Sequence, residues 1–206
     1  MAAPAMHIIM ANKFYRKHLV GKNYSEYIVG TSFPDIRYLA GLKREVTHLE
    51  NHTIKDILEE KDAFMAGMRF HEMFDEARAK FWEADGIYKI LSGTQYSSSA
   101  LKLYEDLFFY DELKNWDEIT TFFDTIYPFE KEIVKDESII LKWHNILKKY
   151  LAKKPSDGET EAYIESLTIT HNAVLKEMKI LDELEKSFKI KQRVLSLVTK
   201  VENYYE

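Results

Sequence analysis

The sequence predicts an all-α protein, a multi-helix bundle that forms a single domain over residues 1–206. Apolar residues recur at spacings of three and four, which is the period of a helix, and strand-like alternation is hard to find. Only 7 glycines and 4 prolines interrupt the chain. The length is ample for one substantial buried core, and no repeat or low-complexity tract divides it.

The expected helices follow one another with short breaks between them. They are expected at about 4–20, 34–42, 53–82, 98–114, 116–127, 136–152 and 159–204, and the third is a candidate for a break near Lys61. Loops are expected at 21–33 and 43–52, with further breaks at 84–86 and 92–94.

Two boundaries carry clear local signals. Pro34 fits the first turn of the helix that it opens, because its missing N–H is not needed there. Later, Pro155 prevents one helix from continuing, and Ser156 with Glu159 matches a capping box for the next. These signals predict helix starts at about 34 and 159.

The last expected helix is long and has an apolar stripe bordered by Glu and Lys. The stripe consists of Leu181, Leu184, Phe188, Leu195 and Val198. A helix that lies along its own bundle explains the stripe, and a homodimer through the C-terminal helix is the alternative.

Composition excludes several classes of function. A net charge of -5 disfavours a general nucleic-acid binder, which needs a basic face. The chain has no cysteine, so any metal must be held by imidazole and carboxylate. The first ten residues lack a basic leader, and no uncharged stretch is long enough to cross a bilayer, so we expect a cytoplasmic protein without a transmembrane segment.

Histidines concentrate near the N-terminus, where five of the seven precede residue 72. The strongest local unit places His71 and Asp75 four residues apart, so that both can grip one ion from the same helix face. Gly67 lies one turn earlier and would leave room for a ligand from elsewhere. Arg78 continues the stripe, where its guanidinium could clamp a substrate phosphate. An exposed ion pair is the alternative for such a pair.

Three further residues are candidates for the same site. Asp35 follows Pro34 in the first turn of a helix. Its carboxylate either interacts favourably with the positive end of the helix dipole or is directed by the turn into the interior of the protein. His7 lies in an apolar helix that should be buried, so its imidazole needs a carbonyl or a metal as partner. His48 follows Thr47 in an expected loop, where exposure is the usual alternative.

Together, these pieces resemble the zinc-dependent phospholipase C family and the related single-strand nucleases. The pattern is His7, Pro34-Asp35, Thr47-His48 and Gly67-xxx-His71-xxx-Asp75, and it covers about residues 5–80. The resemblance implies an all-helical fold with metal-site helices over about 4–82 and supporting helices over about 97–206. It also implies one ion held by Asp35, His48, His71 and Asp75, with Asp75 bridging to a second ion that His7 binds.

The sequence departs from that family in two places. Family members use the amine of an N-terminal tryptophan, whereas this chain begins Met1-Ala2-Ala3-Pro4. Their third zinc needs two histidines and a glutamate, but residues 76–141 contain no histidine. We therefore expect two divalent ions at most, Zn²⁺ first, with Mn²⁺ or Fe²⁺ as alternatives. His171 could supply a missing ligand, although a structural role is its simpler interpretation.

The remaining histidines, His18, His52 and His144, are expected to take no part in the site. The neighbouring Glu72 points about 100° away from His71 on the helix and is not expected to act as the base.

The expected reaction is metal-assisted hydrolysis of a phosphodiester or of a lipid-like or small-molecule phosphoester. Asp35 would orient or deprotonate the attacking water, and Arg78, with Arg37 as a weaker candidate, would clamp the phosphate. One alternative is another helical phosphohydrolase, either acyl-carrier-protein phosphodiesterase-like or of the HD type, although the HD signature itself is absent. The other is a non-catalytic interaction module with a vestigial metal site.

Overall fold

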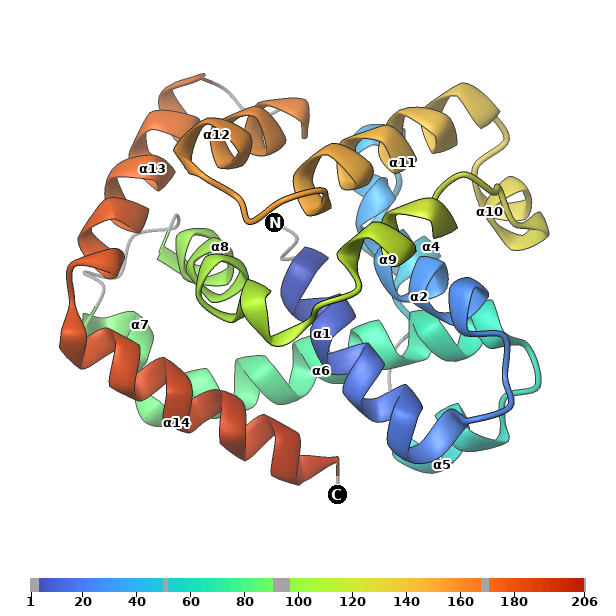
Figure 1. Cartoon of the computed structure of the whole chain (residues 1–206), viewed down its shortest axis with the longest axis horizontal. Helices are drawn as coiled ribbons and strands as arrows, with labels where there is room; N and C mark the ends of the chain where they lie inside the picture. The colour runs from blue at the N-terminus through green and yellow to red at the C-terminus, as the bar shows by residue number, and fades with distance from the viewer. Residues whose placement is uncertain (1–3, 50–51, 91–96, 168–170, 206) are drawn as a thin grey trace.

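In the computed structural model, which describes residues 4–49, 52–90, 97–167 and 171–205, every named element is helical (Figure 1). The all-α prediction is confirmed. The α-helices are α1 (Pro4–Phe14), α2 (Tyr24–Ser32), α3 (Arg37–Ala40), α4 (Arg44–Thr47), α5 (Ile54–Glu59), α6 (Ala63–Asp85), α7 (Ile87–Ile90), α8 (Ser97–Phe109), α9 (Trp116–Phe122), α10 (Pro128–Ile133), α11 (Glu137–Leu151), α12 (Asp157–Ser166), α13 (His171–Glu185) and α14 (Phe188–Tyr204). A π-helix, η1 (Tyr15–Leu19), and two 3-10 turns, η2 (Phe33–Ile36) and η3 (Tyr110–Glu112), complete them.

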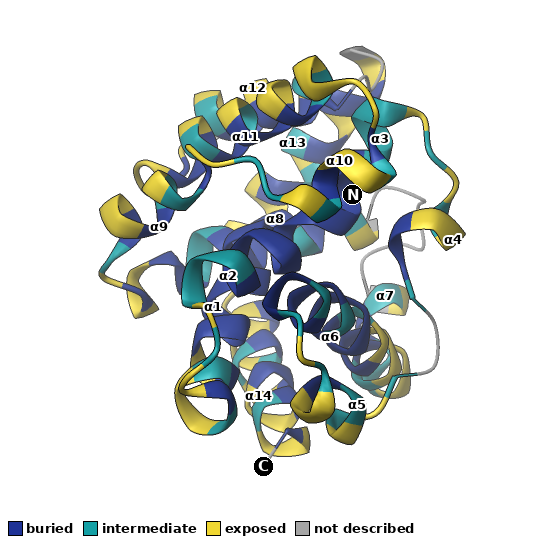
Figure 2. Ribbon diagram, turned by 90° about the vertical axis from the view of Figure 1, so that its right-hand side faces the viewer, coloured by how far each residue is buried: buried dark blue, intermediate teal, exposed yellow. Residues whose placement is uncertain are grey.

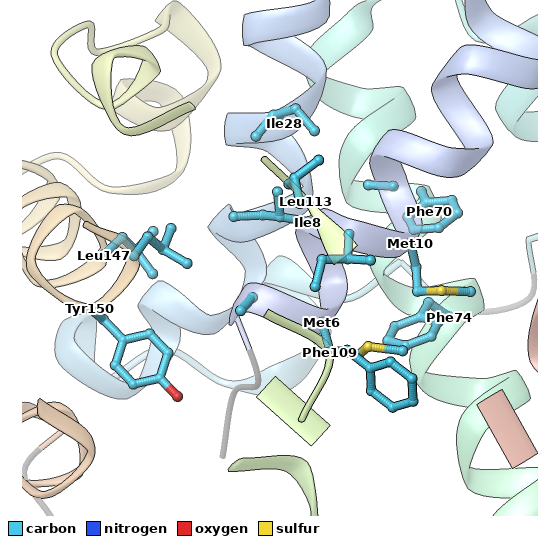
Figure 3. Packing of buried hydrophobic residues seen from close by; sticks show 14 of the residues in the cluster. Met6, Ile8, Met10, Ile28, Phe70, Phe74, Phe109, Leu113, Leu147 and Tyr150 are labelled. Carbon is cyan, nitrogen blue, oxygen red and sulfur yellow. The ribbon is translucent and has the colours of Figure 1, made fainter. Parts of the chain in front are cut away.

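Helix α1 lies at the centre of the molecule, with α2, α6, α8 and α11 packed against it (Figure 1). Only Lys13 among its residues is exposed, because its sequence is apolar on every side and a helix of that kind must be enclosed. Figure 3 shows Met6, Ile8 and Met10 within the core. One cluster of buried apolar side chains runs from α1 to α14. Exposed residues lie mostly on the outer faces of the surrounding helices (Figure 2).

Most of the expected loop at 21–33 is instead helix α2, so the prediction was wrong for residues 24–32, and the cause is packing. Glycine, threonine and β-branched residues in this segment have low helix propensity. Tertiary packing overrides propensity here, because Tyr27, Ile28 and Val29 are fully buried against the core. Asn23 supplies the N-cap by accepting the N–H of Glu26.

Helices α2 and α6 cross at unusually close range, and two glycines make this possible. A Cβ on Gly30 would lie 2.1 Å from the carbonyl oxygen of Phe64, and a Cβ on Gly67 would lie 2.2 Å from that of Tyr27. The space beside Gly67 is therefore filled by the backbone of α2, not by a ligand as its position in the sequence had indicated.

Several other boundaries differ from the expectation. The segment 159–204 forms three helices, α12, α13 and α14, and α10 was not expected. The first helix is α-helical only to Phe14 and continues as the π-turn η1, while α4 places one helical turn in the expected loop 43–52. The break near Lys61 and the break at 84–86 are both confirmed, and Gly86 ends α6 in the left-handed conformation (φ 73°). The expected break at 92–94 lies outside the described residues.

The capping box of Ser156 and Glu159 is present at the start of α12. In the C-terminal stripe, Leu181, Leu184 and Val198 are buried within the chain's own fold, whereas Phe188 is 74% exposed. None of the helices in the described ranges combines the length and the apolar character that crossing a membrane requires.

Candidate metal centre

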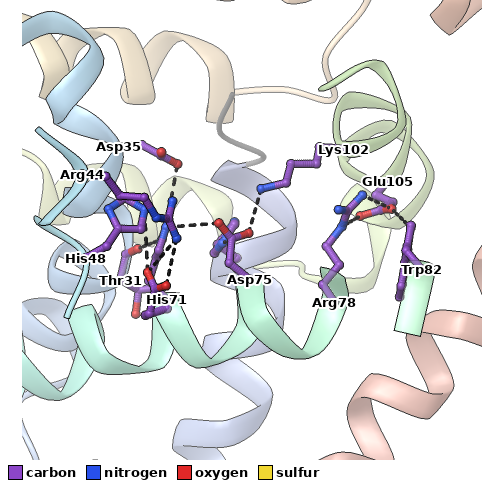
Figure 4. Close-up of polar contacts among 12 residues, drawn as sticks. Thr31, Asp35, Arg44, His48, His71, Asp75, Arg78, Trp82, Lys102 and Glu105 are labelled. Carbon is purple, nitrogen blue, oxygen red and sulfur yellow. Dashed lines mark hydrogen bonds and ion pairs between the residues drawn. The ribbon is translucent and has the colours of Figure 1, made fainter. Parts of the chain in front are cut away.

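The structure brings together all five residues that the sequence singled out as candidate metal ligands. They come from separate elements: His7 from α1, Asp35 from η2, His48 from the end of α4, and His71 and Asp75 from α6. Two overlapping groups have ligand atoms within 4.8 Å of one another, namely His7, His71 and Asp75, and Asp35, His48 and His71. His71 belongs to both groups and lies between Asp35 and Asp75 (Figure 4).

The distances between these side-chain atoms suit a shared cation. His71 Nε2 lies 4.0 Å from Asp35 Oδ2 and 3.9 Å from Asp75 Oδ2, and His7 Nε2 lies 3.4 Å from Asp75 Oδ1. Ligands on a tetrahedral ion with bonds of about 2.0–2.1 Å lie about 3.3 Å apart. Movements of a few tenths of an ångström would bring the nearer atoms onto one ion.

The backbone of α2 fixes the tautomer of His71. Its Nδ1 lies 2.9 Å from the carbonyl oxygen of Thr31, and because a carbonyl can only accept, Nδ1 carries the hydrogen. Nε2 therefore presents its lone pair toward the two aspartates. A metal-binding histidine is held in this way by its other ring nitrogen. The close crossing of α2 and α6 at Gly30 and Gly67 places Thr31 where it can do this.

Both histidines of the group that contains Asp35 have a buried ring nitrogen without a hydrogen bond to any described residue, as do His18 and His52 outside the centre. Nε2 of His48 and Nε2 of His71 are buried and have no hydrogen-bond partner among the described residues. A buried polar atom without a partner is costly, so such atoms are rare in folded proteins. A bound cation would satisfy both nitrogens.

The protonation states match those that divalent metals require. Burial lowers the pKa of His71 to about 3 and that of His48 to about 4, so both imidazoles are neutral near pH 7. Burial acts to raise the pKa of Asp75, but Lys102 and His7 hold it well below its ordinary value. Burial also opposes ionisation of Asp35, but nearby positive charge, including that of Lys102, keeps its pKa lowered. Neutral imidazole and carboxylate are the forms that bind metal.

Sequence reasoning missed Lys102, which lies on α8 and points at the cluster (Figure 4). Its Nζ donates to Asp75 Oδ1 at 2.7 Å, and only 14% of its side chain is exposed. A contact between residues 75 and 102 leaves no local pattern that could have revealed it.

A second missed residue, Asp106, lies one turn later on α8. Its carboxylate accepts the backbone N–H groups of Ala5 at 3.1 Å and Met6 at 2.7 Å, at the start of α1. These are N–H groups for which the first turn of a helix has no internal acceptor. Asp106 therefore anchors the turn that carries His7.

Arg78, expected to clamp a phosphate, is not brought to the cluster. Its guanidinium is buried and pairs through two hydrogen bonds of 2.7 Å with Glu105, which also accepts from Trp82 (Figure 4). Burial disfavours its charge, but Glu105 more than offsets this and raises the pKa of Arg78. The charge of Arg78 is paired with Glu105, and its remaining terminal nitrogen donates to the hydroxyl of Tyr88 at 3.2 Å. The structure thus gives Arg78 the role of an internal brace between α6 and α8.

The weaker clamp candidate, Arg37, stacks on Tyr38 and donates to its hydroxyl at 2.6 Å. Glu72 lies beside His48, with 3.9 Å between its Oε2 and His48 Nε2, and Arg44 binds it at 2.8 and 3.1 Å. Glu72 thus borders the cluster on the His48 side and is engaged by an arginine.

The expected bystander histidines lie outside both ligand groups. His144 donates through Nδ1 to the carbonyl of Phe123 at 3.0 Å, and its Nε2 forms a hydrogen bond of 2.7 Å with Glu130. His52 contacts Arg69 at 3.3 Å, and the ring of His18 lies 4.8 Å from that of Phe14, tilted by 45°. The side chain of His171 lies outside the described residues.

A small cavity adjoins the centre. It is lined by Pro4, His7, Thr31, Ser32, Asp35, His71 and Trp143. Its volume of about 10 Å³ is room for roughly one water molecule. The indole Nε1 of Trp143 is buried and makes no hydrogen bond with any described residue.

Comparisons with known proteins add no further constraint, because no protein-family model, curated protein or solved structure matches the chain. The centre must therefore be interpreted from its own geometry.

Asp106 gives the first testable prediction, which concerns pH. Burial raises its pKa from 3.8 to about 7, against the opposing effect of the Met6 and Ala5 N–H groups. The folded pKa lies above the unfolded one, so this group's stabilisation is full below 3.8 and is lost as pH rises through about 7. We expect the unfolding free energy of the wild type, minus that of Asp106→Asn, to fall by up to about 1.4 kcal/mol per pH unit across this window. Urea unfolding of both proteins measures it.

The subtraction matters because His48 and His71, with lowered pKa values, change stability in the opposite direction as the pH falls. Their contribution is common to both proteins and cancels. A difference that does not vary with pH would show that the two N–H donors keep Asp106 ionised at its ordinary pKa.

Proposed function

We propose that this protein is a metal-dependent hydrolase of a phosphate ester, with its centre formed by His7, Asp35, His48, His71 and Asp75. The observation that carries the proposal is the pair of buried Nε2 atoms, of His48 and His71, that have no hydrogen bond to any described residue although carboxylate oxygens lie close by. Glu72 lies 3.9 Å from His48 Nε2. Asp35 and Asp75 lie 4.0 and 3.9 Å from His71 Nε2. A cation at this point would replace a costly arrangement with coordinate bonds. The expected metal is Zn²⁺, with Mn²⁺ and Fe²⁺ as alternatives, because imidazole and carboxylate ligands suit all three.

Two of the candidate histidine ligands, His48 and His71, are held in place by contacts to their other ring nitrogen, as is usual in metal centres. The carbonyl of Thr31 orients His71, and the hydroxyl of Thr47 lies 3.0 Å from His48 Nδ1. Such supporting contacts hold each ring with Nε2 directed at the metal.

A divalent ion in this position supplies Lewis-acid polarisation of a phosphoryl oxygen and makes a water molecule acidic enough to attack near neutral pH. Asp35 lines the cavity, is ionised, and directs Oδ2 toward His71, which leaves Oδ1 to orient the attacking water and accept its proton. Lys102 brings a positive charge to the same centre and replaces Arg78 as the candidate that meets the charge on the phosphate.

The alternative is a structural metal site in a non-catalytic helical protein. One observation favours it, which is the small cavity, because structural sites are closed whereas catalytic sites keep a position open for water or substrate. The two proposals agree on metal binding and differ on turnover.

We expect protein purified with Zn²⁺ or Mn²⁺ to retain at least about one ion per chain and to cleave a phosphoester, because the centre combines a cation site with an ionised carboxylate. Elemental analysis measures the ion, and a panel of nitrophenyl phosphates, nucleotides and phospholipids measures turnover. Protein stripped by a chelator and shown by circular dichroism to be folded is the matched control, and it should regain activity on reloading.

The outcomes separate the two proposals. Full metal occupancy without turnover across the panel would favour the structural site. Absence of metal from protein reloaded at saturating concentration would contradict both.

A further inference from the structure

The two carboxylate oxygens of Asp75 face different surroundings. Oδ2 lies 3.9 Å from His71 Nε2, on the side shared with Asp35. Oδ1 lies 3.4 Å from His7 Nε2 and 2.7 Å from the ammonium nitrogen of Lys102. The side where a second, bridged ion would bind therefore already has a cation.

The surroundings of Lys102 favour its ion pair with Oδ1 of Asp75. Its side chain is 14% exposed and that of Asp75 is 15% exposed, so water screens the pair only in part. Removing either partner would leave the other charge poorly solvated and unpaired. The position on α8 is itself fixed, because Asp106, one turn later, is bound to the start of α1.

A second metal ion and this ammonium compete for the same space. An ion bound to Oδ1 would lie about 2.0–2.2 Å from that oxygen. With Lys102 at 2.7 Å from the same atom, the two cations would be separated by less than about 5 Å. Repulsion over that distance in a poorly hydrated site disfavours the presence of the second metal ion and the Lys102 ammonium at the same time.

We propose that the ammonium of Lys102 takes the place of a second metal ion, so that the centre binds a single divalent ion through Asp35, His48, His71 and Oδ2 of Asp75. This inference rests on the proposed metal centre. His7 then contacts Oδ1 of Asp75 together with Lys102, and helps to orient the carboxylate. A fixed ammonium next to a single ion supplies the second positive charge that phosphoryl transfer needs.

The test is the number of ions bound to the wild type, Lys102→Met, Lys102→Arg and the double variant Lys102→Met/His7→Ala. Native mass spectrometry at saturating Mn²⁺ counts them, and electron paramagnetic resonance distinguishes an isolated ion from a spin-coupled pair. We expect one ion in the wild type and in Lys102→Arg, which keeps a cation. We expect two ions in Lys102→Met, where methionine fills the space without charge, and one again in the double variant, where the second ion loses His7.

Each outcome has a separate consequence. Two coupled ions in the wild type would overturn the proposed role of Lys102 but leave the proposed metal centre intact. This result is measured on the wild type alone, so it does not depend on whether the variants fold. No ion in the wild type would contradict the proposed function instead. A folded Lys102→Met that still binds one ion would show that Lys102 does not exclude a second. If Lys102→Met is unfolded without metal, its stoichiometry is measured after refolding with Mn²⁺, and Lys102→Gln provides a second neutral variant.

Discussion

His71→Ala is expected to abolish metal binding and, with it, any metal-dependent hydrolysis. His71 is the one residue common to both groups of candidate ligands, so its loss disrupts either arrangement. Removing a supporting residue typically weakens metal affinity about 10- to 100-fold, and removal of a ligand should exceed that. Titration with Zn²⁺, followed by calorimetry at one fixed pH, measures the affinity. The pH is fixed because imidazole binds metal only when it is neutral.

The same substitution also removes a buried ring and the donor to the Thr31 carbonyl, so the variant must be shown to be folded. Circular dichroism and thermal unfolding provide this check. His52→Ala is the matched control, because it removes a histidine that lies outside both ligand groups and should leave the metal affinity unchanged. Equal affinities in His71→Ala and His52→Ala would contradict the assignment of the centre.

Four of the five candidate ligands carry a short-range signal in the sequence, and His48 is the exception. His71 and Asp75 are one helical turn apart, Asp35 follows the proline that opens η2, and His7 interrupts an otherwise apolar helix. Spacing could indicate that each side chain was suited to a metal, and the family resemblance placed them in one site. Neither the spacing nor the resemblance could give the distances between these side chains.

The residues that the sequence missed act across long distances in the chain. Lys102 meets Asp75, and Asp106 meets Ala5 and Met6, through the packing of α8 against α1 and α6. Neither contact follows from a helical period. The prediction that Arg78 binds a phosphate failed for a related reason. Helical periodicity gives the direction in which a side chain points, but it could not show that Glu105 lies there as its partner.

Helix α2 shows where propensity and packing disagree. Its residues are weak helix formers, and the segment owes its structure to burial against α6. Gly30 looked like part of a loop, although its function in the fold is to let two helices approach. The same crossing sets the position of the Thr31 carbonyl behind His71, so the fold and the candidate site depend on one contact.

Gly67→Ala is accordingly expected to destabilise the fold severely. The new Cβ would lie 2.2 Å from the carbonyl oxygen of Tyr27 and 2.6 Å from the backbone nitrogen of Thr31, and backbone atoms cannot move aside as a flexible side chain can. Overpacking a well-filled interior costs about 1–3 kcal/mol, and a clash with backbone should reach the upper end or exceed it. Urea unfolding at neutral pH measures the loss.

Separation of α2 from α6 should also weaken the metal centre, because the 2.9 Å hydrogen bond from His71 to Thr31 would lengthen. We expect metal affinity to fall by about 10- to 100-fold in any Gly67→Ala protein that remains folded, as for loss of a supporting contact. Gly158→Ala is the matched control: a Cβ there meets nothing within 4 Å, and alanine is the better helix former, so stability should be unchanged or slightly raised. Similar unfolding free energies for the two variants would show that α2 and α6 do not approach as closely as this structure places them.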